Sequence, residues 1–98
     1  MIQFTKEFIF NNMAPLAGAA HNRFHLNIEG YSVSIIGGGM AYGDGVHTFE
    51  VMITRGEQNH TEEVFPEYFN KKHNIAGFVP VNEVVFGLNS FFAEETYV

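Results

Sequence analysis

The residues with the strongest suggestion of chemistry form the segment Gly37–Gly45, which reads GGGMAYGDG. Glycine-rich loops bind phosphates through converging backbone N–H groups, and the spacing of the glycines is then fixed. A dinucleotide-binding loop carries Gly-x-Gly-x-x-Gly before a helix, but the sixth residue from Gly37 is Tyr42 and a predicted strand follows. A Walker loop continues with Lys and Ser or Thr, whereas Asp44 follows Gly43. The segment therefore does not predict a nucleotide site.

Two interpretations of Gly37–Gly45, hereafter the glycine loop, remain open. The first is a bulged connection between two strands, with Asp44 and Gly45 in a turn. The second is a contact loop, because glycine is costly to order and binding residues often lie on loops. In the second interpretation Met40 and Tyr42 are the apolar anchors, and Asp44 makes a polar contact.

Two histidines at i, i+4 spacing, His21 and His25, would align as metal ligands on a helix. The alternation from Phe24 to Ile28 instead predicts a strand, which places the two histidines on different elements. In addition, Asn22 stands where the zinc hydrolase motif has Glu. We therefore predict no metal site.

The remaining polar residues do not form a catalytic pattern. The paired carboxylates Glu62–Glu63 and Glu94–Glu95 are adjacent in sequence, so they point apart and are solvated. The chain has no cysteine, which excludes disulfides, thiolate metal sites and a cysteine nucleophile. Its serines lack the Gly-x-Ser-x-Gly context of a nucleophile. We expect a non-enzymatic protein with no catalytic residues and no cofactor.

A second candidate for contact is the aromatic segment Phe65-Pro66-Glu67-Tyr68-Phe69. The chain carries 11 Phe and 4 Tyr in 98 residues, a load that is difficult to bury completely in so small a domain. The segment is interpreted either as a loop folded onto the edge of the core or as an exposed patch for a partner or a dimer. In the latter case Phe65, Tyr68 and Phe69 make the contact.

Three segments alternate apolar and polar residues with the period of a strand: residues 24–28, 32–35 and 48–54. Glu29–Gly30 is a plausible tight turn between the first two. The glycine loop connects the second segment to the third, and Ile75–Val79 is a further short strand. The pattern predicts a three- to four-stranded antiparallel sheet with one apolar face.

The clearest helix lies at the C-terminal end of the sequence. Apolar residues recur there with helical spacing and form one stripe: Val81, Val84, Val85, Leu88, Phe91 and Phe92. The stripe needs an apolar partner, and the inner face of the strands provides one. We therefore predict an α+β fold in which the sheet packs against this amphipathic helix, in a single domain spanning residues 1–98.

The other segments have weaker patterns. Residues 2–10 alternate loosely and are interpreted as a strand. Asn11–Pro15 has the composition of a helix start, and it predicts a short N-terminal helix over residues 16–22. Residues 56–74 are polar and mixed, so we expect mostly loop there, with one helical turn.

The formal net charge is −6, from 11 acidic and 5 basic residues. Nucleic-acid binding needs a basic face, so direct contact with nucleic acid is not expected. An acidic chain can instead bind a protein with a basic surface. The N-terminal sequence MIQFTKEFIF has no basic region and no long apolar run, so we predict no signal peptide, no membrane contact and a cytoplasmic location.

The chain resembles small accessory proteins encoded by bacteriophages. The resemblance is carried by YGDG at residues 42–45, TFEV at 48–51 and the helix sequence VNEVV at 81–85, and it covers residues 31–92. It implies a protein that acts in the host cytoplasm by binding and inhibiting a host component, such as a CRISPR effector, a restriction enzyme or a polymerase. It assigns no functional residue.

These observations favour a small non-enzymatic protein-binding module from a phage or mobile element, which inhibits its target by occlusion. Two other classes remain open. One is a small-molecule-binding or catalytic domain with the glycine loop as a lid, and the other is a structural homo-oligomer, such as a homodimer. The candidate interface residues are Met40, Tyr42, Asp44, Phe65, Tyr68 and Phe69.

Overall fold

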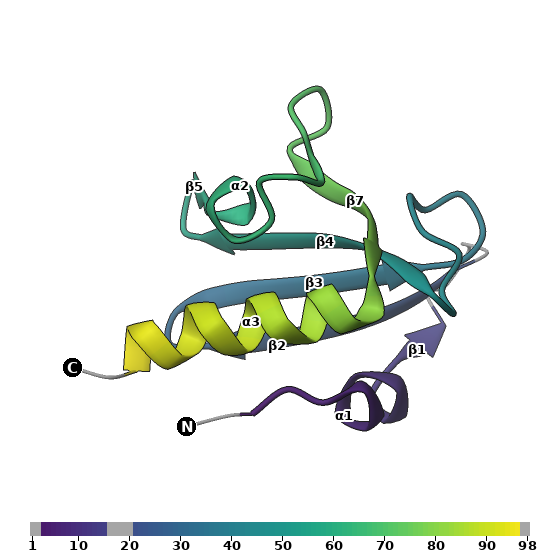
Figure 1. The fold of residues 1–98 in the computed structure, drawn as a ribbon, viewed down its shortest axis with the longest axis horizontal. Coiled ribbons are helices and arrows are strands. Elements are labelled where there is room, and N and C mark those ends of the chain that lie inside the picture. The colour runs from purple at the N-terminus through teal and green to yellow at the C-terminus, as the bar shows by residue number, and fades with distance from the viewer. Residues whose placement is uncertain (1–2, 16–20, 97–98) are drawn as a thin grey trace.

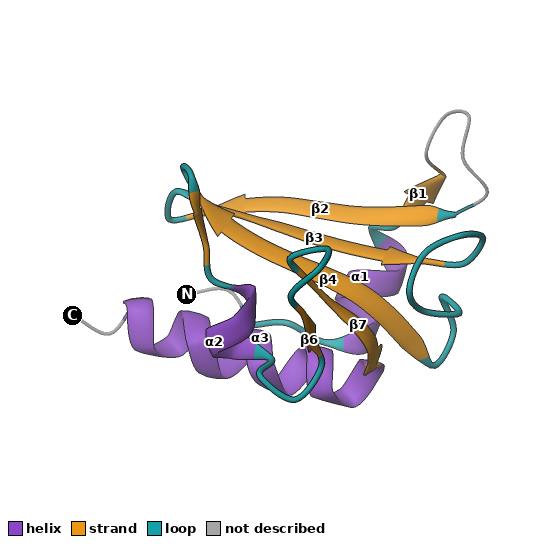
Figure 2. Ribbon diagram, turned by 90° about the horizontal axis from the view of Figure 1, so that it is seen from above, coloured by secondary structure: helices purple, strands orange, loops and turns teal. Residues whose placement is uncertain are grey.

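The computed structural model describes residues 3–15 and 21–96, which form an antiparallel sheet with helices on one of its sides (Figures 1 and 2). The predicted α+β class is confirmed. The elements in chain order are α1 (Lys6–Asn11), β1 (Ala14–Pro15), β2 (Asn22–Ile28), β3 (Tyr31–Gly37), β4 (Thr48–Arg55), β5 (Gln58–Asn59), α2 (Thr61–Val64), β6 (Phe69–Asn70), β7 (Ile75–Pro80) and α3 (Val81–Thr96).

The strands are arranged in the order β1-β2-β3-β4-β7-β6, and β5 pairs with β4 outside this path. The three central strands follow one another in the chain, as the alternation predicts. Glu29 and Gly30 form the tight turn between β2 and β3, with φ angles of 55° and 83°. Positive φ at both positions is typical of the two-residue turns that match the twist of a hairpin.

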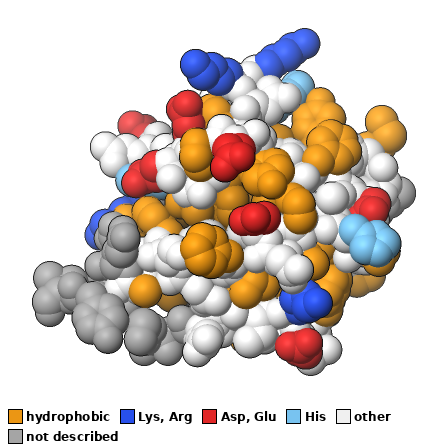
Figure 3. All heavy atoms as spheres, in the orientation of Figure 1, with side chains coloured by type: hydrophobic (Ala, Val, Ile, Leu, Met, Phe, Trp, Pro, Cys, Tyr) orange, Lys and Arg blue, Asp and Glu red, His pale blue; other side chains and the backbone are white. Residues whose placement is uncertain are grey.

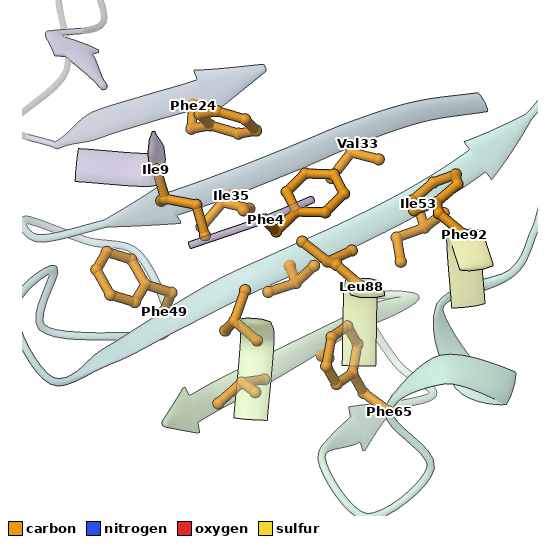
Figure 4. Packing of buried hydrophobic residues seen from close by; sticks show 14 of the residues in the cluster. Phe4, Ile9, Phe24, Val33, Ile35, Phe49, Ile53, Phe65, Leu88 and Phe92 are labelled. Atoms are coloured by element: carbon orange, nitrogen blue, oxygen red, sulfur yellow. The ribbon is translucent and has the colours of Figure 1, made fainter. Parts of the chain in front are cut away.

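The core lies between the central strands and α3. The stripe of α3 faces the sheet as predicted, because Val84, Leu88 and Phe92 are 0–1 % exposed. Figure 4 shows Leu88 and Phe92 directed at inward-facing side chains of β3 and β4, among them Ile35 and Ile53. Helix α3 therefore closes one face of the sheet.

The predicted number of strands was too low. The described residues form seven strands, and the three additional ones, β1, β5 and β6, are two residues long. A two-residue strand contains no alternation that a sequence pattern could reveal, since it is defined by its pairing with a neighbour. The one helical turn expected in residues 56–74 is present as α2.

A short N-terminal helix is present, as predicted, but it lies earlier in the chain than expected, where the sequence pattern indicated a strand. Residues 6–11 form helix α1 and not a strand, and Asn11 ends that helix instead of starting one. Thr5 is the N-cap, because its side-chain oxygen accepts the N–H of Phe8 at 3.0 Å. Asn is common at both ends of a helix, so its presence alone does not distinguish a start from an end. Residues 16–20 of the predicted helix lie outside the described residues, and Asn22 belongs to β2.

The segment before α1 is fixed to α3 by one side chain. The amide oxygen of Asn89 accepts the N–H of Phe4 at 2.7 Å, and its amide nitrogen donates to the carbonyl of Phe4 at 2.9 Å. The ring of Phe4 is 1 % exposed and packs against Phe92 with their centroids 5.9 Å apart. The N-terminal segment is therefore part of the core.

Candidate protein-contact surface

The glycine loop is anchored to two other elements by its backbone. The carbonyl of Tyr42 accepts the N–H of Phe78 in β7 at 2.8 Å, and the carbonyl of His47, just after the loop, accepts the N–H of Val81 in α3 at 2.9 Å. The N–H of Tyr42 also donates to a carboxylate oxygen of Glu50 at 3.0 Å. Hydrogen bonds therefore hold the glycine loop and the residue after it against β4, β7 and the start of α3.

Close backbone packing explains why this loop contains so much glycine. A Cβ atom on Gly43 would lie 2.5 Å from the Cα atom of Phe49. A Cβ atom on Gly37 would lie 2.3 Å from the Cα atom of Gly45, and Gly45 itself has φ +81°. Real Cβ contacts are not this short, so these three positions require glycine for packing, whatever else the loop does.

Asp44 organises the turn at the end of the loop. One of its carboxylate oxygens accepts the N–H groups of Val46, His47 and Thr48 at 2.8, 2.7 and 2.9 Å. Hydrogen bonds from backbone N–H groups stabilise the charged form, and they hold the pKa of Asp44 well below its ordinary value. This carboxylate oxygen is thus occupied within the turn expected at Asp44 and Gly45.

The ring of Tyr42 leaves the loop and lies over β7. Its hydroxyl is hydrogen-bonded to Nε2 of His73 at 3.0 Å, and its centroid is 5.9 Å from that of Phe78. Tyr42 is half-buried, whereas Met40, two residues earlier, is 92 % exposed. The two predicted anchors of the loop therefore differ: Tyr42 is held in place, and Met40 is free to be covered.

The aromatic segment after α2 is divided between core and surface. Phe65 is 4 % exposed and lies against α3, where a Cβ atom on Gly87 would come within 2.5 Å of its ring. Tyr68 and Phe69 are half-buried. Phe65 is therefore a core residue in this structure, and Tyr68 and Phe69 are the members of the segment that reach the surface.

The fold brings residues from both candidate segments into one shallow depression. Tyr42 comes from the glycine loop, Tyr68 and Phe69 follow α2, and Gly77 and Phe78 belong to β7. The depression has a volume of about 530 Å³, and we call it the aromatic depression. The sequence places Tyr42 and Tyr68 26 residues apart, so their convergence is a result of the pairing of β7 with β4 and β6. Met40, Asp44 and Phe65 are not among its lining residues.

Phe78 is the aromatic residue of this surface that the sequence did not reveal. Its side chain is 60 % exposed, and its backbone is left-handed with φ 54°. A bulky residue in this region is an outlier, because its Cβ atom crowds the backbone. The pairing of β4 with β7 is irregular between Phe49 and Val51, and Phe78 lies where that irregularity turns a side chain outward. A bulge of this kind has no signal in a short apolar run.

Comparisons with known proteins identified no relative of this chain. No family model, curated protein or solved structure matches this chain. Within residues 3–15 and 21–96, no group of three or more His, Asp or Glu residues is placed to hold a metal ion. Across the same residues, no helix is both long and apolar enough to cross a bilayer. We therefore base the proposed function on the geometry of the surface.

Proposed function

We propose that the protein is a non-enzymatic protein-binding module, encoded by a phage or mobile element, that inhibits a host protein by occlusion. The observation that supports this function is the convergence of Tyr42, Tyr68, Phe69 and Phe78 in the aromatic depression. Tyrosine and other aromatic residues dominate protein interfaces, because they bury a large area at a small cost in side-chain entropy. The net charge of −6 favours a partner with a basic surface, for example the nucleic-acid site of a CRISPR effector.

The strained backbone of Phe78 is a second reason to assign contact to this surface. A left-handed conformation costs roughly 1–2 kcal/mol for a residue with a Cβ atom, and glycine would avoid that cost. The Phe78 side chain is 60 % exposed, so little of this cost is offset by burial. Strained positions are concentrated at functional sites, where the side chain is needed in a particular place.

The alternative in which the glycine loop is a lid over a small ligand has less support. A lid must leave its site, but the glycine loop is hydrogen-bonded to β7 and is linked to α3 through His47. In the homo-oligomer alternative, the same exposed aromatic surface contacts a second copy of the chain. This alternative predicts a complex that contains only copies of this protein.

The substitution Phe78→Gly separates binding from folding. It removes the exposed ring and relieves the left-handed strain, so we expect the free energy of unfolding to stay within about 1 kcal/mol of the parent. We expect partner binding to weaken by about 1–3 kcal/mol, or roughly tenfold to a hundredfold in Kd. The measurement is affinity capture from bacterial lysate, followed by calorimetry with the purified partner.

The matched control is Val46→Ala, which truncates another exposed apolar side chain that does not line the aromatic depression. This variant should bind the partner as the parent does. Equal binding by parent and Phe78→Gly would contradict the proposed surface. A protein that captures only copies of itself, and sediments as an oligomer, would instead favour the structural alternative.

A further inference from the structure

A second hollow, next to the aromatic depression, lies between the segment 63–68 and the exposed side of α3. It has a volume of about 330 Å³, and its walls include Glu63, Glu67, Tyr68, Glu83, Phe86 and Phe91. This is near the lower limit of the range of roughly 300–1,000 Å³ for small-molecule pockets, so its capacity suits one or two side chains. We call it the acidic groove.

The charge of the acidic groove has one sign. Glu63 is paired with His60, but neither Glu67 nor Glu83 forms an ion pair with any described residue. None of the residues lining the groove is Lys or Arg. Figure 3 shows acidic side chains around apolar surface over α2 and α3, with basic side chains toward the top and margins of the view. The groove therefore complements a cation.

An exposed aromatic ring adjoins these carboxylates. Phe86 is 68 % exposed on α3, outside the apolar stripe that packs on the sheet. Glu83 precedes it by one helical turn, so the two side chains share one face of the helix. The glycine at position 87 lets the ring of Phe65 lie against the helix backbone, which closes the floor of the groove. An aromatic ring beside carboxylates offers a cationic group both a face on which to stack and negative charge.

We propose that the acidic groove binds an arginine side chain from a segment of the partner protein. This inference rests on the proposed function, because the aromatic depression and the acidic groove share Glu67 and Tyr68 and so form one continuous surface. A guanidinium group is planar, so it can stack on Phe86 while it donates hydrogen bonds to Glu67 or Glu83. The molecule itself contains this kind of stacking, since the guanidinium carbon of Arg55 lies 5.0 Å from the ring centroid of Tyr31.

The test uses short peptides and the full chain labelled with ¹⁵N. The probe is Gly-Arg-Gly with both ends blocked, and its matched controls replace arginine with citrulline or with lysine. We expect saturable shifts of the amides of residues 63–68 and 83–91 with the arginine peptide, at a Kd in the millimolar range. Citrulline has the shape of arginine without its charge, so its peptide should bind at least about tenfold more weakly.

Variants of the chain then assign the contact to the groove. The double variant Glu67→Gln and Glu83→Gln, and separately Phe86→Ala, should each weaken arginine binding by at least about fivefold while the spectrum of the fold is retained. Glu62→Gln is the matched control, because Glu62 lies on α2 but does not line the groove. It should bind the arginine peptide as the parent does.

Several outcomes would overturn the inference. They are the absence of saturable shifts, equal binding of the citrulline peptide, and shifts that map outside the groove. Equal binding of the lysine peptide would overturn the choice of arginine. Groove amides that shift on dilution of the protein alone would show that a second copy of the chain is the occupant. Because the probes are peptides, a negative result here leaves the Phe78→Gly test of the proposed function intact.

Discussion

In the turn that ends the glycine loop, one carboxylate oxygen of Asp44 accepts three successive backbone N–H groups. The sequence identified Asp44 as a residue suited to a polar contact, and in the structure this oxygen is used within the turn itself. A short acidic side chain next to glycine is typical both of a binding loop and of a self-capped turn. Only the conformation of the following residues distinguishes the two, and this conformation depends on the pairing of β3 with β4.

We predict that the turn loosens in acid. The pKa of Asp44 is lowered in the folded state, so its contribution to stability is fully present above the unfolded value of about 3.9. This contribution decreases as the pH falls below that value toward the folded pKa. The measurement is a carboxyl NMR titration of Asp44, together with hydrogen exchange of the amides of Val46, His47 and Thr48.

Substitution provides the control for this pH effect. Asp44→Asn retains a side-chain oxygen that can accept the three N–H groups but removes the titrating charge. Its turn amides should therefore show no pH dependence between about pH 5 and pH 2, unlike those of the parent. If the parent amides exchange equally fast at both pH values, after correction for intrinsic rates, the carboxylate does not stabilise the turn.

Gly87 allows a second test at the scale of one residue. In Gly87→Ala the new Cβ atom would lie 2.5 Å from the buried ring of Phe65, and we expect a net loss of about 1–3 kcal/mol in the free energy of unfolding. In a Phe65→Ala background the clash is absent. There the same substitution should stabilise by up to about 1 kcal/mol, because alanine is the better helix former.

Urea unfolding of the four proteins in this cycle measures the interaction between the two positions. The expected sign change is specific to a clash between the introduced methyl group and the ring of Phe65. A similar loss in both backgrounds would mean that Gly87 is required for another reason.

Among the elements, the central strands and α3 were predictable, and the two-residue strands were not. The central strands show their period of two over residues 24–28, 32–35 and 48–54, and α3 shows its stripe over several turns. Their inward faces follow from sequence alone. The strands β1, β5 and β6 are too short to carry a period. The irregular pairing that exposes Phe78 was equally hidden, so only part of the aromatic depression could be found before the structure.

The contact between the N-terminal segment and α3 yields a prediction about elements. Asn89→Ala leaves both the N–H and the carbonyl of Phe4 without their side-chain partners, and we expect a loss of about 1–3 kcal/mol in the free energy of unfolding. The matched control is Asn82→Ala, an exposed asparagine on the same helix, which should change stability by less than about 0.5 kcal/mol. Urea unfolding distinguishes the two variants. A loss for Asn89→Ala as small as that for Asn82→Ala would show that the segment is held by the Phe4 ring alone.

Over the whole molecule, the net negative charge is the property that the sequence stated most directly. The net charge is −6, and in the acidic groove neither Glu67 nor Glu83 is neutralised by a described partner. The total was readable from composition, whereas its concentration beside Phe86 was not, because Glu67 and Glu83 are 16 residues apart and meet only through the packing of segment 63–68 on α3.

This charge predicts how the folded state responds to salt. Repulsion between carboxylates destabilises the compact chain, and salt shortens its range from roughly 30 Å at 0.01 M to about 3 Å at 1 M. We therefore expect the free energy of unfolding at neutral pH to rise with sodium chloride, by less than about 1 kcal/mol. Thermal unfolding in sodium and potassium chloride measures this rise. In the variant Glu67→Gln and Glu83→Gln the rise should be smaller, and an equal rise would place the repulsion elsewhere.

The two hydrogen bonds between Phe4 and Asn89 also affect the order in which the chain can fold. The two residues are 85 positions apart, so they close a loop that includes almost every other contact of the domain. Strands β2, β3 and β4 end at Arg55, so they are synthesised before Asn89 and can begin to pair first. The hydrogen bonds of Phe4 must wait for Asn89, so we expect the N-terminal segment to dock after the central strands have paired.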